Sequence, residues 1–174
     1  NLVPKILETS VEKNPFIKLE YIKHPTLSEL WLYGEFSLEF WKQVIEDLFN
    51  MIQKFRNYNK PVTKQEYDAI YLEKTSNRID ELIKKNNFFK KIFEEDFIII
   101  NGKKLKNWKL TKDEIEDKIN TMFNKEDNCL IHGDLYFSNI LYDSERKIYK
   151  LIDPRGKWGE STSGDIKYDI AKIR

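Results

Sequence analysis

The segment Cys129–Gly156 reads CLIHGDLYFSNILYDSERKIYKLIDPRG and is the part of the chain that points to a specific chemistry. It alternates short apolar runs with polar loops, a pattern typical of short strands joined by turns. The apolar runs are residues 130–131, 139–142 and 148–152. A polar turn at residues 143–146 can fold the second run back on the third as a hairpin.

Three polar side chains, Asp134, Asn139 and Asp153, fall at the ends of these predicted strands. The hairpin would bring Asn139 toward Asp153. Magnesium prefers hard oxygen ligands, keeps several waters and bridges substrate phosphates, so one Asp and one Asn can suffice where a nucleotide supplies the rest. The pattern therefore favours a divalent-cation site. The alternative is that both aspartates only end strands in turns.

The spacing of these residues points to a reaction. Four residues separate Asp134 from Asn139, as in the catalytic loop of protein kinases, where the Asp accepts the substrate hydroxyl proton and the Asn binds magnesium. Asp153, on the following strand, takes the place of the metal-binding Asp of kinases.

The same residues resemble the aminoglycoside phosphotransferase and choline kinase-like family, which has a two-lobed, protein-kinase-like fold. The resemblance is carried by His132-Gly133-Asp134, Asn139, Asp153, Gly164-Asp165 and Tyr168-Asp169-Ile170-Ala171. It covers the last third of the chain strongly and the beginning weakly. It implies that ATP and Mg²⁺ are used to phosphorylate a hydroxyl group of a small molecule.

The resemblance also assigns roles to individual residues. Asp134 is expected to be the catalytic base, and Asn139 and Asp153 the metal ligands. His132 and Asp169 are expected to hold the catalytic loop in shape. A histidine beside a strand end is more often a hydrogen-bonded structural residue than an acid or base, and this favours a structural role for His132 even without the resemblance.

Arg155 is ambiguous, because a guanidinium near the phosphate site could stabilise the transferred charge. The alternative, which we favour, is pairing with Asp165 or Asp169.

By this resemblance the fold is α+β, a mainly helical, protein-kinase-like large lobe with short catalytic β-hairpins. Residues 1–22 would be the end of the small lobe and the hinge, and residues 23–174 the large lobe, incomplete at its C-terminal end. Residues 2–8 and 16–22 are predicted to form two strands. By the resemblance, main-chain groups of Glu20, Tyr21 and Ile22 would face the adenine of ATP. The alternative is that the two strands form an ordinary hairpin.

The first nineteen residues contain no glycine, although a kinase-like nucleotide site needs a glycine-rich loop and a strand lysine. We therefore expect this sequence to be a fragment of a longer protein. On its own it should bind magnesium-ATP feebly and be inactive.

Local signals predict the remaining elements. Capping boxes at residues 26–29, 63–66 and 111–114 predict three helix starts. A repeat of apolar residues every three or four positions predicts a helix over residues 37–56. Asn101-Gly102 between two strand-like runs predicts a β-hairpin.

Composition narrows the function classes. Thirty basic and twenty-nine acidic residues give a formal net charge of +1, which argues against a nucleic-acid partner. No apolar run reaches the roughly eighteen residues of a membrane span, so no membrane partner is expected. The single cysteine, Cys129, lies among apolar residues and is expected to be a buried thiol in a reducing, cytoplasmic setting.

The function that these observations favour is transfer of the ATP γ-phosphate to a hydroxyl of a sugar, an amino alcohol or an aminoglycoside. Two alternatives remain: a kinase-like binding or scaffold module without turnover, and a magnesium-dependent hydrolase that uses the same carboxylates. The sequence does not indicate an oligomeric state.

Overall fold

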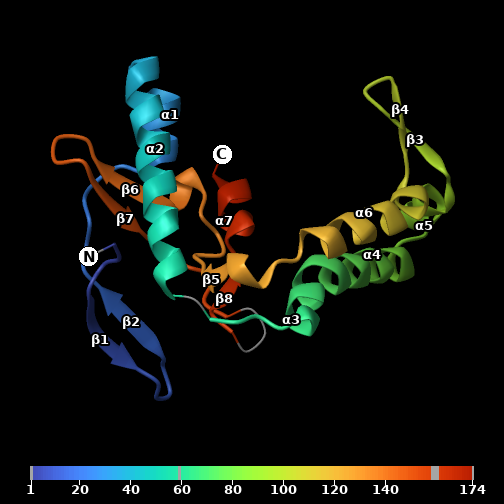
Figure 1. Cartoon of the computed structure of the whole chain (residues 1–174), viewed down its shortest axis with the longest axis horizontal. Coiled ribbons are helices and arrows are strands. Elements are labelled where there is room, and N and C mark those ends of the chain that lie inside the picture. The colour runs from blue at the N-terminus through green and yellow to red at the C-terminus, as the bar shows by residue number, and fades with distance from the viewer. Residues whose placement is uncertain (1, 59, 158–160, 174) are drawn as a thin grey trace. The chain divides into compact units, whose positions relative to one another are not determined.

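The computed structural model describes residues 2–58, 60–157 and 161–173, and it divides the chain into two compact units. The first unit comprises residues 1–60 and 127–174, and the second comprises residues 61–126. Helices and small two-stranded antiparallel sheets occur together, so the α+β class predicted from the sequence is confirmed (Figure 1). The lobe boundary that we predict between residues 22 and 23 stays a prediction.

The described residues of the first unit form three helices and three strand pairs. They are α1 (Leu27–Tyr33), α2 (Leu38–Phe55), α7 (Ile166–Lys172), β1 (Ile6–Ser10) with β2 (Phe16–Leu19), β5 (Asn128–Leu130) with β8 (Ser163–Asp165), and β6 (Ile140–Asp143) with β7 (Ile148–Leu151). Short 3-10 turns occupy Arg56–Tyr58 and Phe137–Asn139, and a third, Lys125–Asp127, includes the last residues of the second unit in the sequence and the first residue that follows them. The predicted strands near the N-terminus are present, although their bounds differ by several residues.

Helix α1 begins where the sequence predicts. The Thr26 side chain accepts a hydrogen bond from the Glu29 backbone N–H, and the Glu29 carboxylate accepts one from the Thr26 N–H, so the capping box is confirmed. Gly34 lies at the C-terminal cap of α1, and Ser37 caps α2. Local chemistry therefore determines the turn between the two helices.

The core of the first unit is built on one face of α2. Val44, Leu48 and Ile52 are buried, as the periodicity predicts. Fully buried residues from the other elements of the unit complete this core: Leu27, Leu135, Ile140 and Ile166. Burial of each such side chain contributes about 1.5–3 kcal/mol, so this core stabilises the elements that carry the loops between β5 and β7.

The hairpin of β6 and β7 supports those loops. Its register pairs Ile140 with Leu151, so the residues just outside each strand lie next to each other. The carboxylate of Asp143 accepts hydrogen bonds from the backbone N–H groups of Glu145 and Arg146, which fixes the turn. The predicted hairpin is confirmed.

The second unit contains the remaining helices and one hairpin. Its elements are α3 (Lys64–Asp68), a π-helical segment (Ala69–Glu73), α4 (Lys74–Lys85), α5 (Asn87–Glu94), β3 (Phe97–Ile100), β4 (Lys103–Lys106) and α6 (Trp108–Met122). The capping box at Thr63 and Glu66 is confirmed. So is the hairpin at Asn101-Gly102, where both residues have positive φ angles of 50° and 76°.

The prediction of a capping box at residues 111–114 is wrong. Helix α6 begins one turn earlier, because the Asn107 side chain accepts a hydrogen bond from the Trp108 N–H. The amide of Asn107 also donates to carbonyls of Ile92 and Glu95, so a contact with α5 and the residue after it holds this cap in place. The Thr111 hydroxyl instead donates to the Asn107 carbonyl inside the helix.

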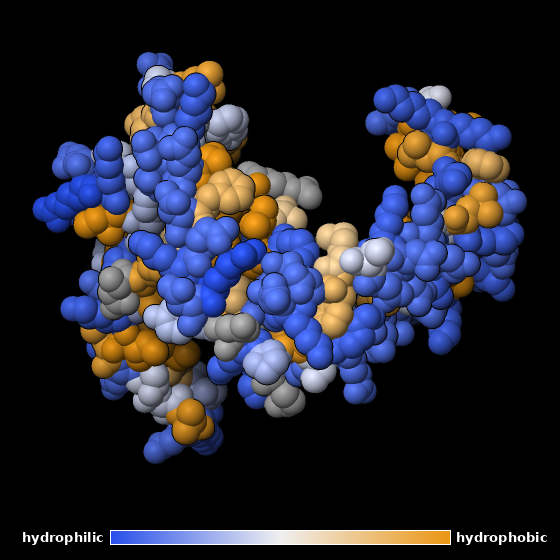
Figure 2. Space-filling view, viewed as in Figure 1, coloured by the Kyte–Doolittle hydropathy of each residue, from blue (hydrophilic) through white to orange (hydrophobic). Residues whose placement is uncertain are grey.

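Polar and apolar side chains alternate over the surface, and Figure 2 shows apolar groups reaching the surface among many hydrophilic ones. None of the helices formed by the described residues combines the length and the apolar character needed to cross a bilayer.

Candidate active site

The candidate site is the loop that joins β5 to β6, and helix α7 holds its start. The buried carboxylate of Asp169 accepts hydrogen bonds from two consecutive backbone N–H groups, His132 at 2.6 Å and Gly133 at 2.8 Å. Burial raises the pKa of Asp169, and the two backbone hydrogen bonds offset part of that effect. The loop therefore depends on a side chain that lies 36 residues further along the chain.

His132 is buried and links the loop to the residue after β7. Its Nε2 lies 3.0 Å from the Ile152 carbonyl oxygen, and its Nδ1 accepts the Asp134 N–H at 3.3 Å. A ring protonated at Nε2 alone satisfies both contacts. The His132 carbonyl also accepts the Arg155 N–H at 2.9 Å, so the ring and the backbone of His132 bind residues on either side of Asp153.

Asp134 follows a left-handed glycine, Gly133 with φ of +78°, which reverses the chain direction at the loop. The Asp134 carbonyl accepts the backbone N–H of Tyr136 at 2.9 Å and the side-chain amide of Asn139 at 2.8 Å. The Asp134 side chain keeps 36% of its surface exposed. Its backbone is therefore fixed while its carboxylate remains reachable.

Asn139 and Asp153 are brought close together by the hairpin. The Asn139 carbonyl accepts the Ile152 N–H at 3.0 Å, which places Asn139 beside the residue that precedes Asp153. Because the Asn139 amide nitrogen donates to Asp134, its amide oxygen is left to bind a cation. Asp153 is exposed and has a φ of +54°, a backbone conformation that costs a non-glycine residue about 1–3 kcal/mol.

These two oxygen donors fit a magnesium ion that is also held by phosphate. In the described part of the chain, no three or more His, Cys, Asp or Glu side chains gather closely enough to hold a metal ion by themselves. Magnesium requires few protein ligands when a nucleotide and water complete its shell. The donor set therefore suits metal-nucleotide binding better than a dedicated protein metal site.

One residue that the sequence analysis does not identify, Lys172, lies beside Asp134. Lys172, in the last turn of α7, has its Nζ 3.6 Å from the Asp134 Oδ1 and 2.6 Å from the Tyr136 hydroxyl oxygen. By sequence alone Lys172 is one of many lysines, and only the folded chain places it beside Asp134.

The predicted adenine-facing segment lies at the end of the first hairpin. The Glu20 N–H donates to the Lys5 carbonyl at 2.8 Å, so this donor is already used within the hairpin. Tyr21 is 88% exposed. Among the described residues no hydrogen bond joins residues 20–22 to the loop that carries Asp134, and their predicted role stays a prediction.

Arg155 does not pair with the carboxylates that we expected from the sequence. Asp169 binds the loop backbone, and Asp165 caps α7 and lies 3.0 Å from the Lys167 Nζ. A guanidinium nitrogen of Arg155 lies 3.5 Å from the Tyr168 hydroxyl. Both Arg155 and Lys172 therefore approach Tyr168, since the Lys172 Nζ lies 5.2 Å from the centre of the Tyr168 ring.

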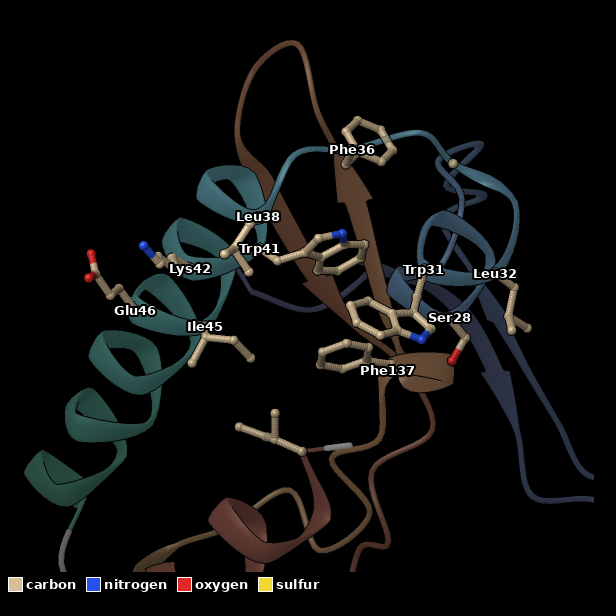
Figure 3. A pocket seen from close by; sticks show the side chains of 12 residues that line it. Ser28, Trp31, Leu32, Phe36, Leu38, Trp41, Lys42, Ile45, Glu46 and Phe137 are labelled. Atoms are coloured by element: carbon tan, nitrogen blue, oxygen red, sulfur yellow. The ribbon is translucent and has the colours of Figure 1, made fainter.

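An aromatic groove of about 1050 Å³ adjoins the loop at Phe137. Figure 3 shows Trp31, Trp41 and Phe137 facing it, with Glu46 and Lys42 on the helix beside it. The rings of Trp41 and Phe137 stack with centroids 6.0 Å apart. This packing anchors the short turn Phe137–Asn139, which carries Asn139 into the site.

Comparisons of the chain with protein-family models, curated proteins and solved structures give no match. The resemblance to small-molecule kinases therefore stays an expectation that depends on the motif residues of the sequence.

Proposed function

We propose that the protein is a phosphotransferase that moves the γ-phosphate of ATP to a hydroxyl of a small molecule. In this proposal residues 1–22 are the end of the small lobe and the hinge of a protein-kinase-like fold, and residues 23–174 belong to its large lobe. ATP is the phosphate donor, Mg²⁺ is the metal ion, and the cytoplasm is the setting.

One observation carries the proposal. Asp134, Asn139 and the residue before Asp153 are joined by hydrogen bonds through the Asp134 and Asn139 carbonyls, and a buried carboxylate on α7 fixes the start of the same loop. Three residues that the sequence separates thus meet at one end of a hairpin. Residues that only ended strands in turns would not require this shared network.

The reaction assigns a task to each group. The carboxylate of Asp134 takes the proton of the acceptor hydroxyl while that oxygen forms a bond to the γ-phosphorus. The bond between the γ-phosphorus and the oxygen shared with the β-phosphate breaks, and ADP leaves with that electron pair. The Asn139 amide oxygen and the Asp153 carboxylate would hold a Mg²⁺ ion, which would supply positive charge against the phosphates.

The exposure of the two carboxylates supports this assignment. Asp153 is exposed and Asp134 is partly exposed, so substrates can reach both, whereas Asp169 is fully buried and can act only through the loop. Sugars, amino alcohols and aminoglycosides are the acceptor classes that we propose.

The test is to incubate the full-length protein with magnesium-ATP and a panel of sugars, amino alcohols and aminoglycosides. We expect ADP release that depends on one acceptor class and matches the amount of phosphorylated acceptor. ADP and phosphate release that is equal with and without acceptors would indicate the hydrolase alternative. No ADP release with any acceptor would indicate the binding or scaffold module without turnover.

A further inference from the structure

Lys172 occupies an unusual setting for a lysine near a helix end. Its ammonium group contacts the Asp134 carboxylate and the Tyr136 hydroxyl, and it lies 4.4 Å from the centre of the Tyr136 ring. Its side chain is only 22% exposed. A lysine that only interacts with the helix dipole would extend into solvent, as Lys54 does in the last turn of α2.

The surroundings keep this ammonium group charged. The hydrogen bond with Tyr136 raises the pKa of Lys172, although partial burial acts in the opposite direction. Two aromatic rings also face the ammonium group, and such faces attract a cation. At neutral pH Lys172 is therefore a fixed positive charge beside the proposed catalytic base.

Helix α7 holds the loop at two points through residues on one face. Asp169 and Lys172 are three positions apart, which places both on the same side of the helix. Asp169 binds the backbone before Asp134, whereas Lys172 binds the Asp134 side chain and the side chain of Tyr136. The first contact fixes the backbone before Asp134. The second restricts the direction of the Asp134 carboxylate and, through Tyr136, also holds the loop after Asp134.

We propose that Lys172 is a positioning residue that holds Oδ1 of Asp134, so that Oδ2 is presented to the acceptor hydroxyl. This inference rests on the proposed phosphotransfer. An aspartate side chain has few rotatable bonds, and one charged contact is enough to select its direction. A misplacement of about 1 Å at a reacting group can lower a rate roughly a hundredfold, so this contact should affect turnover more than substrate binding.

The test compares Lys172→Met, which removes the charge and keeps the length of the side chain, with Lys172→Arg, which keeps the charge. Lys54→Met is the matched control. In the full-length protein we expect Lys172→Met to lower kcat about 10- to 100-fold while KM for ATP and acceptor changes less than about threefold. Lys172→Arg should keep at least about a third of the wild-type kcat, and Lys54→Met should change nothing.

A double-mutant cycle separates positioning from direct phosphate contact. If Lys172 acts through Asp134, Lys172→Met should change kcat little in an Asp134→Asn background. An equal fold-loss in both backgrounds would overturn the inference, because Lys172 would then act independently of Asp134. A kcat of Lys172→Met within threefold of wild type would also overturn it. Lys172→Gln serves as the second neutral variant if Lys172→Met does not fold.

Hydrogen exchange does not require enzymatic turnover, so it tests this inference separately from the proposed function. Hydrogen exchange of the amides in residues 132–139 should accelerate about tenfold or more in Lys172→Met and should be normal in Lys172→Arg and Lys54→Met. If the wild-type protein transfers no phosphate, the proposed function fails and this exchange decides whether Lys172 holds the loop. Unchanged exchange in Lys172→Met would overturn the inference.

Discussion

Replacing Asp169 with Asn tests how the loop before Asp134 is held. The substitution preserves the shape of the side chain but leaves one acceptor oxygen where the carboxylate has two. In the wild type both oxygens are used, one by the His132 N–H and the other by the Gly133 N–H. The Asn variant therefore presents an N–H group to one of these donors, and that buried donor loses its partner.

The expected loss of stability in Asp169→Asn follows from that unpaired donor. A buried N–H group without a partner costs about 1–3 kcal/mol. The loss of charge adds little, because burial already raises the pKa of Asp169 and so disfavours its ionised form. We therefore expect Asp169→Asn to lower the free energy of unfolding by about 1–3 kcal/mol at neutral pH. A displaced loop should also lower kcat roughly a hundredfold.

The pH dependence has a defined sign. Because the folded-state pKa of Asp169 is raised above 3.8, the folded protein holds this proton more tightly than the unfolded chain. The contribution of this group to stability is fully present below pH 3.8 and falls as the pH rises through the folded-state pKa. The stability difference between wild type and Asp169→Asn should decrease over that range.

Urea unfolding of the 174-residue chain, followed by circular dichroism, measures these quantities, and hydrogen exchange locates the change. Glu39→Gln is the matched control, because it makes the same chemical change at a side chain that is 83% exposed in α2. An Asp169→Asn variant as stable as the wild type, with unchanged exchange at residues 132–139, would refute the reasoning.

Three further predictions concern other parts of the first unit. Asp153→Ala should abolish productive magnesium-ATP binding in calorimetry, whereas Asn139→Ala should weaken it less because water can partly replace a neutral ligand; unchanged affinity in Asp153→Ala would make Asp153 structural. Burial raises the pKa of the Cys129 thiol to about 11, so its alkylation should be slow at pH 8 and fast in urea, and the protein should lose stability between pH 9 and about 11; rapid alkylation of the folded protein would contradict this. Leu48→Ala should lower the free energy of unfolding by about 2–5 kcal/mol in urea titrations, and a loss below about 1 kcal/mol would contradict its place in the core.

Local interactions explain which parts of the fold the sequence predicts well. The capping boxes of Thr26 and Thr63 and the turn at Asn101-Gly102 involve residues at most a few positions apart, and all three form as predicted. The cap at Thr111 does not form, because Asn107 caps the helix one turn earlier and binds carbonyls of α5 and the residue after it. A local pattern carries no information about that contact.

The same distinction applies to the candidate site. The spacing of Asp134 and Asn139 and the hairpin that follows could be derived from neighbouring residues. The contact of Lys172 with Asp134 joins residues 38 positions apart, and by sequence alone Lys172 is one of many surface lysines in this chain. Among the described residues no hydrogen bond or ion pair joins Arg155 to Asp165 or Asp169, because the nearby Lys167 binds Asp165 and two backbone donors that only the folded chain brings together bind Asp169.

The most direct test of the proposed function is the turnover of Asp134→Asn in the full-length protein, with magnesium-ATP and the acceptor that the wild type phosphorylates. Loss of a positioned general base should lower kcat by roughly two to four orders of magnitude. The melting temperature should change little, because the Asp134 carboxylate is partly exposed and the loop is held by its backbone. Near-normal turnover in a folded Asp134→Asn variant would contradict the role of Asp134 as the base and, with it, the proposed mechanism.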